Sequence, residues 1–463
     1  MKRGLLVLIF SLMMVGVQAQ RLVTFEDAIR LALKNSLLLN TERNNLELAQ
    51  AQKLSGIASL GPNVSANVSV SQFNGNSFNQ QLGRAVNGVR DNVSGSIGAN
   101  ILVFNGFSSF NYMRASNEQL DAQTYMVQRT TQDVMNTVAT QYLQVLLDIE
   151  MLTIAKQNHE AQLKLLEQVK EQFNVGAKSK VDEYNQDALT KGAEYRAVLA
   201  QVKLDNDKAM LAQTLMMDAN EPFEVQKPSM EPGLIRNNEM NIDSLITQAK
   251  SHRPDYLRAA KLERAAQFQA RGSLGNMLPS LVAIANIGTS YNFQHDVPRR
   301  VFDQDTGTEI DNPDYPRPFT EQMRTNNYYK QFGAQLSIPI FNGFSNRTTY
   351  IRNRVAFRNT QLLHTNLDIQ LKNDVLRSVR IFEGSRKAYV VSIDQLVAAE
   401  NAFSFESERY KLGVTNFVDY TNANRTLVQA QTDKAQAEYT LVFQKILVDY
   451  AIGTLRPEDI LGQ

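Results

Sequence analysis

The sequence predicts a mainly α-helical protein that also carries β-hairpins and is built from two copies of one structural unit. Three observations lead to this fold class. They are an internal repeat, two segments in which apolar and polar residues alternate, and long segments with a helical period and hardly any proline. Each copy is predicted to run in the order helix, strand, strand, long helix, turn and helix.

The internal repeat rests on two matches at one spacing. The pentapeptide Phe-Asn-Gly-Phe-Ser at 104–108 recurs at 341–345, an offset of 341 − 104 = 237. At the same offset, the segment 173–182 matches 410–419, and both contain a glycine followed by Val-Asp. Two separated matches in one register are not expected by chance.

The spacing changes upstream of these matches. Pro62 and Pro279 match at an offset of 279 − 62 = 217, so the second copy has gained 237 − 217 = 20 residues after its proline. Loops tolerate insertions of this size, since closing a longer loop costs little free energy. We therefore predict a first repeat at 20–235 and a second repeat at 236–463.

Each copy contains a predicted β-hairpin with one apolar and one mostly polar face. The first hairpin covers about 62–104, and the second covers about 279–341 with a longer, solvated loop at 294–327. We expect four strands of roughly ten residues, a length that suits tilted strands crossing a bilayer. Pro339 cannot donate a hydrogen bond to a ladder and is expected to mark a strand end.

The remaining sequence has the period of helices. Two stripes of apolar residues, spaced by three and four, predict seams where helices pack. The stripes are Val134, Val138, Tyr142, Val145, Ile149 and Leu152, and Leu363, Leu367, Leu371, Val375, Val379 and Phe382.

Two of the helices are predicted to be unusually long. The segment 107–173 has no proline, so at ~1.5 Å per residue it could reach about 100 Å. The matching stretch after Gly343 runs unbroken to about Tyr410. Each rod is expected to end at a turn, containing Gly176 or Gly413, from which a helix returns, because glycine suits a left-handed C-terminal cap.

The N-terminus has the features of a cleaved signal peptide at 1–19. Lys2 and Arg3 precede an apolar run that is too short to span a membrane, and Ala19 completes a small-residue cleavage site. Beyond residue 20 there is no uncharged apolar run of spanning length, which excludes an ordinary helical membrane protein. An exported chain could still cross a membrane as a barrel.

The composition argues against several other functions. Lys plus Arg number 48 and Asp plus Glu 47, so no global field favours nucleic acid as a partner. The absence of cysteine excludes disulfides and thiol chemistry. The four histidines have no ligand spacing, and no glycine-rich phosphate loop is present, so we expect no metal, no cofactor and no enzyme activity. The histidines are His159, His252, His295 and His364.

Four strands are too few to close a barrel in lipid. Open edges would leave backbone amides unsatisfied in hydrocarbon, so the chain must associate. A dimer, trimer or tetramer would give 8, 12 or 16 strands, obtained from four strands per chain. Barrels of about 8 strands fill with side chains, which disfavours the dimer for a conducting tube and leaves trimer or tetramer.

Four features occur together in the sequence: the duplicated helix–hairpin–helix plan, the proline before each first strand, the strand end Ile-Pro-Ile-Phe-Asn-Gly at 338–343 and the glycine turns before Val-Asp. In this combination the sequence resembles the TolC-like outer-membrane efflux protein family. The resemblance covers nearly the whole chain after the signal peptide. It implies a homotrimer with a 12-stranded β-barrel in outer-membrane lipid and a long α-helical barrel in the periplasm. It also implies a passive exit duct of tripartite efflux or type I secretion, with a periplasmic adaptor and an inner-membrane pump of RND or ABC type as partners.

The resemblance also implies roles for single residues. The family's pore constriction, a pair of aspartates, falls on Asp419 and Asn422, and Asn422 departs from that pattern. Three copies of Asp419 around an axis would form a cation site. The alternative is an exposed aspartate that favours the dipole of a helix start.

Contacts that hold the family's closed end fall on Tyr410 and Asp182, while Thr415 replaces a basic partner. Plain core packing is the alternative for Tyr410. Gly106 and Gly343 are expected to serve the bends from strand to helix. The two helical turns resemble adaptor-docking tips, with simple capping as the alternative. They contain Val175, Gly176, Ala177 and Lys178, and Leu412, Gly413 and Val414.

Two other functions compete with the duct. A general diffusion porin would be mostly strand, whereas this chain is mostly helix by its periodicity. A periplasmic coiled-coil adaptor would not need the alternating hairpins. The sequence therefore favours the duct.

Overall fold

The computed structural model describes most of the chain after the N-terminus, and the predicted signal peptide at 1–19 lies outside the described residues. The described residues are 21–79, 84–218, 222–227, 241–295, 297–303, 305, 307–313 and 315–457. The chain divides into two compact units, each assembled from separate segments. The first contains Met1–Leu46, Ala122–Ala259 and His364–Gln463, and the second contains Glu47–Asp121 and Ala260–Leu363.

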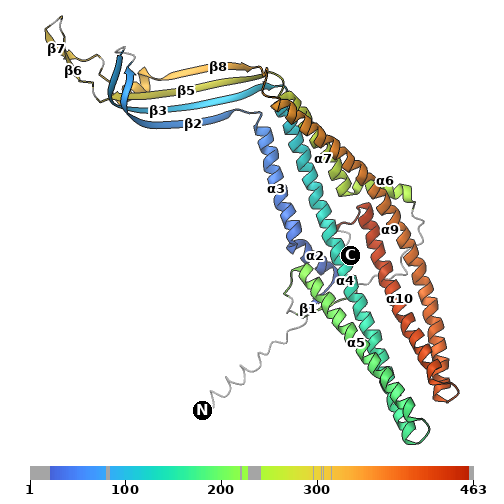
Figure 1. The fold of residues 1–463 in the computed structure, drawn as a ribbon. Helices are drawn as coiled ribbons and strands as arrows, with labels where there is room; N and C mark the ends of the chain where they lie inside the picture. The colour runs from blue at the N-terminus through green and yellow to red at the C-terminus, as the bar shows by residue number, and fades with distance from the viewer. Residues whose placement is uncertain are drawn as a thin grey trace, which may run out of the picture. The chain divides into compact units, whose positions relative to one another are not determined.

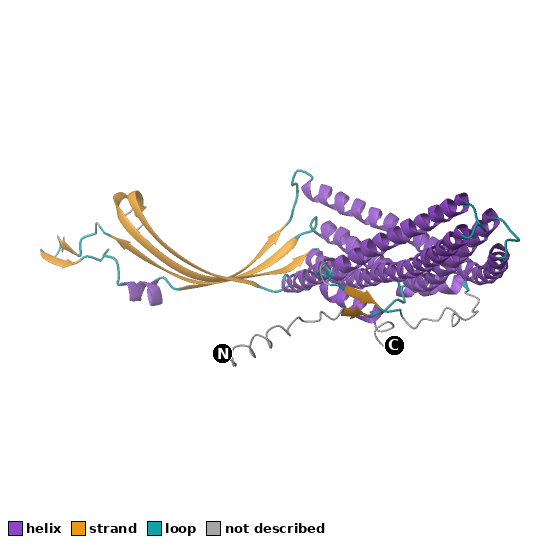
Figure 2. Ribbon diagram, turned by 90° about the horizontal axis from the view of Figure 1, so that it is seen from below, coloured by secondary structure: helices purple, strands orange, loops and turns teal. Residues whose placement is uncertain are grey.

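Most of the described chain is helical, as predicted (Figures 1 and 2). The two longest helices, α4 (Ser108–Asn174) and α9 (Ser345–Lys411), have 67 residues each. Each is followed by a turn and a helix of 36 residues, α5 (Lys180–Leu215) or α10 (Phe417–Ile452). The shorter helices are α2 (Phe25–Asn35), α3 (Leu37–Ala58), α6 (Ile242–His252), α7 (Pro254–Gly275) and α8 (Phe319–Glu321). Among the described residues, no helix has the length and apolar character needed to cross a membrane.

The two glycine turns are confirmed. Gly176 and Gly413 have φ angles of 78° and 73°, the left-handed conformation that glycine adopts without strain. The predicted repeat limits stay a prediction, because the compact units combine segments from both halves. The limit at 235 and 236 also lies outside the described residues.

The first apolar stripe forms part of the main core of the first unit. Val138, Tyr142 and Val145 are fully buried there, and α2 packs on the same cluster. The Tyr142 hydroxyl lies 2.7 Å from the carbonyl oxygen of Gln226 and 3.0 Å from that of Val23. It thereby anchors a small parallel sheet that the sequence did not predict. This sheet pairs β1 (Arg21–Val23) with β4 (Phe223–Val225).

The second stripe is confirmed from Leu371 to Phe382, where the apolar side chains are buried. Leu363 is 66% exposed in the single chain, so the predicted seam stays a prediction at that end of the stripe. A helical period shows which residues share a face, but it does not show where along the helix that face is covered.

The second unit contains one antiparallel sheet of four strands, in the order β2-β3-β5-β8 (Figures 1 and 2). The strands are β2 (Asn63–Asn79), β3 (Arg84–Asn105), β5 (Ser280–Gln294) and β8 (Tyr329–Ser337). As predicted, β2 and β5 each begin directly after a proline. The strand β8 ends before Pro339, which confirms the strand end, although Ile338 and Ile340 lie outside the strand.

The predicted length of roughly ten residues holds for β8, with 9 residues, and is wrong for the other strands. The strands β2, β3 and β5 have 17, 22 and 15 residues. Polar residues predicted as loop continue the β2–β3 ladder beyond the pair Ser71 and Asn92. Ladder hydrogen bonds join main-chain groups, so pairing continues where the apolar alternation has stopped.

The predicted loop at 294–327 contains local structure. It includes β6 (Arg300–Asp303) paired with β7 (Thr308–Asp311), α8 and a π-helical turn (Gln322–Asn326). The Gln322 side chain accepts from the Asn292 backbone N–H and donates to its carbonyl, each at 3.1 Å. Because β8 pairs with β5 only as far as Gly288, Gln322 supplies the hydrogen bonds that a longer strand would have made.

The two bends from strand to helix use a glycine with positive φ, as predicted. Gly106 and Gly343 have φ angles of 64° and 62°. A Cβ atom at Gly106 would lie 2.4 Å from the Gly275 carbonyl oxygen, so this bend also requires close backbone approach. No such neighbour lies within 4 Å of Gly343 among the described residues of the single chain.

Candidate functional site

The four-stranded sheet has two chemically different faces. The register places alternate residues of each strand on one face, and these are mainly apolar over the central rows. Val68, on the outer strand β2, is 80% exposed. A contiguous exposed apolar face of this kind marks contact with a membrane or a partner. The face carries Val64, Ala66, Val68, Val70, Ile97, Ala99, Ile101, Ala283, Ala285, Ile287, Phe332, Ala334 and Leu336.

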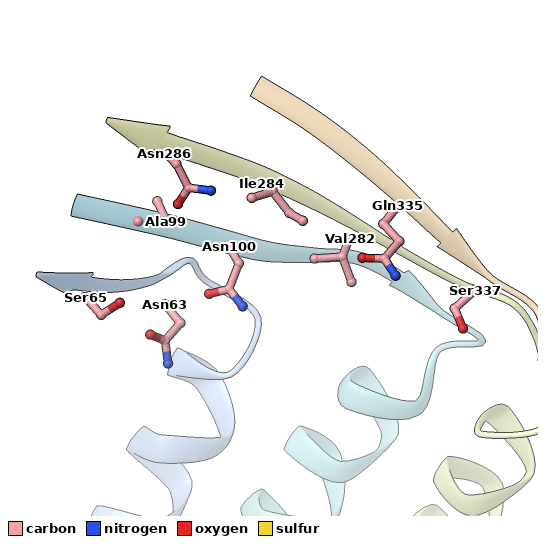
Figure 3. A pocket seen from close by; sticks show the side chains of 10 residues that line it. Asn63, Ser65, Ala99, Asn100, Val282, Ile284, Asn286, Gln335 and Ser337 are labelled. Atoms are coloured by element: carbon pink, nitrogen blue, oxygen red, sulfur yellow. The ribbon is translucent and has the colours of Figure 1, made fainter. Parts of the chain in front are cut away.

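The opposite face is mainly polar and contains a hollow of about 570 Å³. Figure 3 shows side chains from all four strands around this hollow, with Gln335 beside Val282. The register places Asn100 between Asn63 and Ile284. The sheet thus combines an apolar surface on one side with amide and hydroxyl groups on the other. That is the arrangement of a sheet that separates lipid from an aqueous lumen.

Both outer strands of the sheet have an open edge. The strand β2 pairs only with β3, and β8 pairs only with β5, within the described chain. All residues of β8 and residues 63–72 of β2 are exposed. Two unpaired edges with antiparallel directions can pair with each other only if they come from different copies of the chain.

The connection between α4 and α5, which contains Gly176, ends in a capping box at the start of α5. The Asp182 carboxylate accepts from the Ser179 backbone N–H at 2.9 Å and from its hydroxyl at 2.7 Å, and the Ser179 hydroxyl accepts from the Asp182 N–H. The Ser179 hydroxyl and N–H together lower the pKa of Asp182. Asp182 therefore has a local role at the start of α5.

Tyr410 lies in a buried aromatic cluster near the end of α9. Its ring stacks on Tyr420 with centroids 5.0 Å apart, and the Lys178 ammonium lies 4.3 Å from its ring centroid. Burial and the nearby Asp182 carboxylate raise the pKa of Tyr410 to about 12. None of the described residues hydrogen-bonds the buried Tyr410 hydroxyl. The structure therefore places Tyr410 and Asp182 near each other and adds Lys178, a contact that sequence reasoning missed.

The second turn leads into α10 through a similar cap. The Asn416 side chain accepts from the Asp419 backbone N–H at 2.9 Å and donates to the Asp419 carboxylate at 3.0 Å. The Thr415 hydroxyl donates to the same carboxylate at 3.3 Å. Asp419 and Asn422 are both exposed in the single chain. The pore role of both residues stays a prediction.

The two turns present apolar side chains to solvent. Val175, Leu412 and Val414 are exposed at their tips. Singly exposed apolar side chains are common on protein surfaces, so the docking role of the two turns stays a prediction.

An ion-pair cluster around the buried Asp148 joins α4 to α5, and the sequence did not reveal it. Asp148 is 2% exposed, and its carboxylate accepts from Lys203 and, at 3.0 Å, from Gln144. Lys203 also lies 3.1 Å from Asp207. Burial and the neighbouring Asp207 carboxyl raise the pKa of Asp148, and Lys203 opposes this shift. Asp148 and Lys203 are 55 residues apart, so only the fold shows that they meet.

Among the described residues, no group of three or more acidic or histidine side chains is arranged to hold a metal ion. The geometry presents two surfaces, namely the two-faced sheet and the tips of the helical hairpins. Long helical hairpins joined to a two-faced sheet with open edges are features of a membrane channel subunit.

Comparison with known proteins identifies the family. The sequence matches the outer membrane efflux protein family over residues 28–215 and 245–454, and the chain belongs to this family. It is 24% identical to the outer membrane protein TolC of Escherichia coli K12 over 82% of this chain and 73% of the relative. It is also 24% identical to the pyoverdine export outer membrane protein OpmQ of Pseudomonas aeruginosa, over 92% of this chain and 84% of that protein.

Solved structures show the same fold. The outer membrane protein VceC of Vibrio cholerae matches with a TM-score of 0.78 at 14% identity, covering 93% of this chain and 96% of that chain. The CmeC outer membrane channel of Campylobacter jejuni matches with a TM-score of 0.77 at 16% identity, covering 93% and 85%. The protein is thus an outer-membrane efflux channel, which confirms the predicted duct and its location.

Proposed function

We propose that three copies of this chain close a 12-stranded β-barrel in the outer membrane and continue it as an α-helical barrel in the periplasm. The observation that carries this proposal is the two-faced sheet with two open edges. Pairing β2 of one copy with β8 of the next satisfies both edges and keeps the strands antiparallel. The apolar faces then meet lipid, and the polar faces line the lumen.

The trimer is the smallest closed assembly that leaves a lumen, because a barrel of about 8 strands is filled by its own side chains. The segment 63–71 of β2 falls within the ~9–11 residues that a tilted strand needs to cross the hydrocarbon core. The equal lengths of α4 and α9 support the proposal that the two halves are structural repeats.

The duct receives its cargo from other proteins in this proposal. A periplasmic adaptor binds the exposed turns around Gly176 and Gly413, and an inner-membrane pump of RND or ABC type supplies the energy. Tyr410, Asp182 and Thr415 hold the closed state of the helical end in this proposal. The channel itself has no catalytic role, because conduction through a preformed lumen needs no covalent step.

Planar-bilayer recording tests the proposal directly. The purified protein is expected to produce discrete conductance steps after insertion from one side, because each trimer adds one pore. Membranes that contain the inserted protein but carry no stepwise current would contradict the duct.

The same recordings test the predicted constriction at Asp419. In Asp419→Ala, we expect block by a trivalent cation to weaken by at least about tenfold, because a ring of three carboxylates would be lost. Asn422→Ala is the matched control, since it removes a neighbouring polar group without changing the charge. Equal block in wild type and Asp419→Ala would place Asp419 outside the lumen.

A further inference from the structure

The polar face of the sheet contains a band without charged residues. Five successive rows across β2, β3 and β5 hold fifteen side-chain positions, none of which is Asp, Glu, Lys, Arg or His. With 21% charged residues in the chain, about three would be expected among fifteen (0.21 × 15). The positions are 63, 65, 67, 69 and 71, then 100, 98, 96, 94 and 92, and then 284, 286, 288, 290 and 292.

The band is polar because of amides and hydroxyls. Asn286 illustrates the chemistry, since its side-chain oxygen lies over Gly98, 2.6 Å from where a Cβ atom would be. An amide offers both donors and an acceptor, and a hydroxyl does the same. Such groups bind carbonyls, hydroxyls and amines alike. Channels that select ions by charge instead use rings of acidic or basic side chains.

The hollow adds an apolar element to this polar band. Val282 and Ile284 belong to its apolar part, and their cross-strand neighbours on this face are Gln335 and Asn100, respectively (Figure 3). Its volume of about 570 Å³ lies in the range of small-molecule sites, ~300–1,000 Å³. A molecule with an alkyl or aryl body and several uncharged hydrogen-bonding groups matches both parts of this surface.

We propose that this face is a specificity-determining lining of the barrel, which contacts uncharged amphipathic solutes at the hollow and does not sort solutes by the sign of their charge. The inference rests on the proposed duct and adds the chemistry of its barrel section. In this reading, any ion selectivity of the whole channel arises outside the band.

The first test introduces charge into the band. The K⁺/Cl⁻ permeability ratio, from reversal potentials under a KCl gradient, is measured for wild type, Asn286→Asp, Asn286→Lys and the neutral control Asn286→Gln. Three added charges per pore are expected to shift the ratio at least about twofold, toward K⁺ for Asp and toward Cl⁻ for Lys, while Gln leaves it unchanged. Gln335→Glu and Gln335→Lys repeat the test from β8.

The second test uses an uncharged aryl glycoside, 4-nitrophenyl glucoside, with glucose as the matched probe that lacks the aryl group. Interruptions of the single-channel current are expected for the aryl glycoside only, and Ile284→Asn is expected to weaken them about tenfold. Two results from conducting channels would overturn the inference and leave the duct intact. One is a permeability ratio that none of the charge substitutions changes, and the other is the same current response to both probes. A complete absence of conductance would overturn the duct and, with it, the inference.

Discussion

Val68→Arg is expected to abolish assembly of the protein in the outer membrane, whereas Ser69→Arg is expected to be tolerated. The two residues are neighbours in the middle of β2 and lie on opposite faces of the sheet. An arginine on a lipid-facing strand at the bilayer midplane costs about 2–4 kcal/mol, or roughly 6–12 kcal/mol for three copies. A total of that size is comparable to the whole stability of a typical protein.

The measurement is the amount of protein that fractionates with the outer membrane as an SDS-resistant oligomer on unheated gels. Ser69→Arg is the matched control because it adds the same side chain one residue away, on the face proposed to meet water. Equal amounts of oligomer for the two variants would contradict the assignment of the faces.

Lys203→Met is expected to lower the stability of the helical hairpin by about 1–3 kcal/mol at neutral pH, because it leaves the buried Asp148 carboxylate without its partly solvated cation. The loss should depend on pH. Burial already raises the pKa of Asp148 in the folded protein, and removal of Lys203 raises it further. A carboxyl group with a raised folded pKa favours folding below its unfolded pKa of about 3.9, and this contribution is lost as the pH rises through the folded pKa.

The deficit of Lys203→Met should therefore be largest at neutral pH and shrink as the pH falls toward about 4. Thermal unfolding followed by circular dichroism at several pH values measures it. Lys191→Met is the matched control on the same helix, since it removes only an exposed pair with Glu194 and should cost less than about 1 kcal/mol. A deficit that is equal at all pH values, or equal in the two variants, would contradict a buried charge at Asp148.

The sequence predicted the parts of the fold that repeat with a local period. The unbroken helices α4 and α9, the glycine turns and the strand starts after Pro62 and Pro279 all follow from spacing and residue type. The strand lengths did not follow, because the ladder beyond Ser71 is held by main-chain hydrogen bonds between polar residues. Side-chain alternation carries no signal there.

The features that sequence reasoning missed join residues that are distant along the chain. Lys178 meets the ring of Tyr410 across 232 residues (410 − 178), and Gln322 meets the backbone of Asn292. These contacts have no periodic signature, because they depend on how two separate elements are brought together. The closed-end roles of Tyr410, Asp182 and Thr415 stay predictions, and Tyr410 lies in the aromatic cluster near the turns.

The most direct test is the oligomeric state of the mature protein after extraction from outer membranes in mild detergent, measured by light scattering that separates protein mass from detergent mass. We expect a trimer of the 52.1 kDa chain less its signal peptide, with no stable monomer, since two open strand edges must be paired. A stable, water-soluble monomer would contradict it.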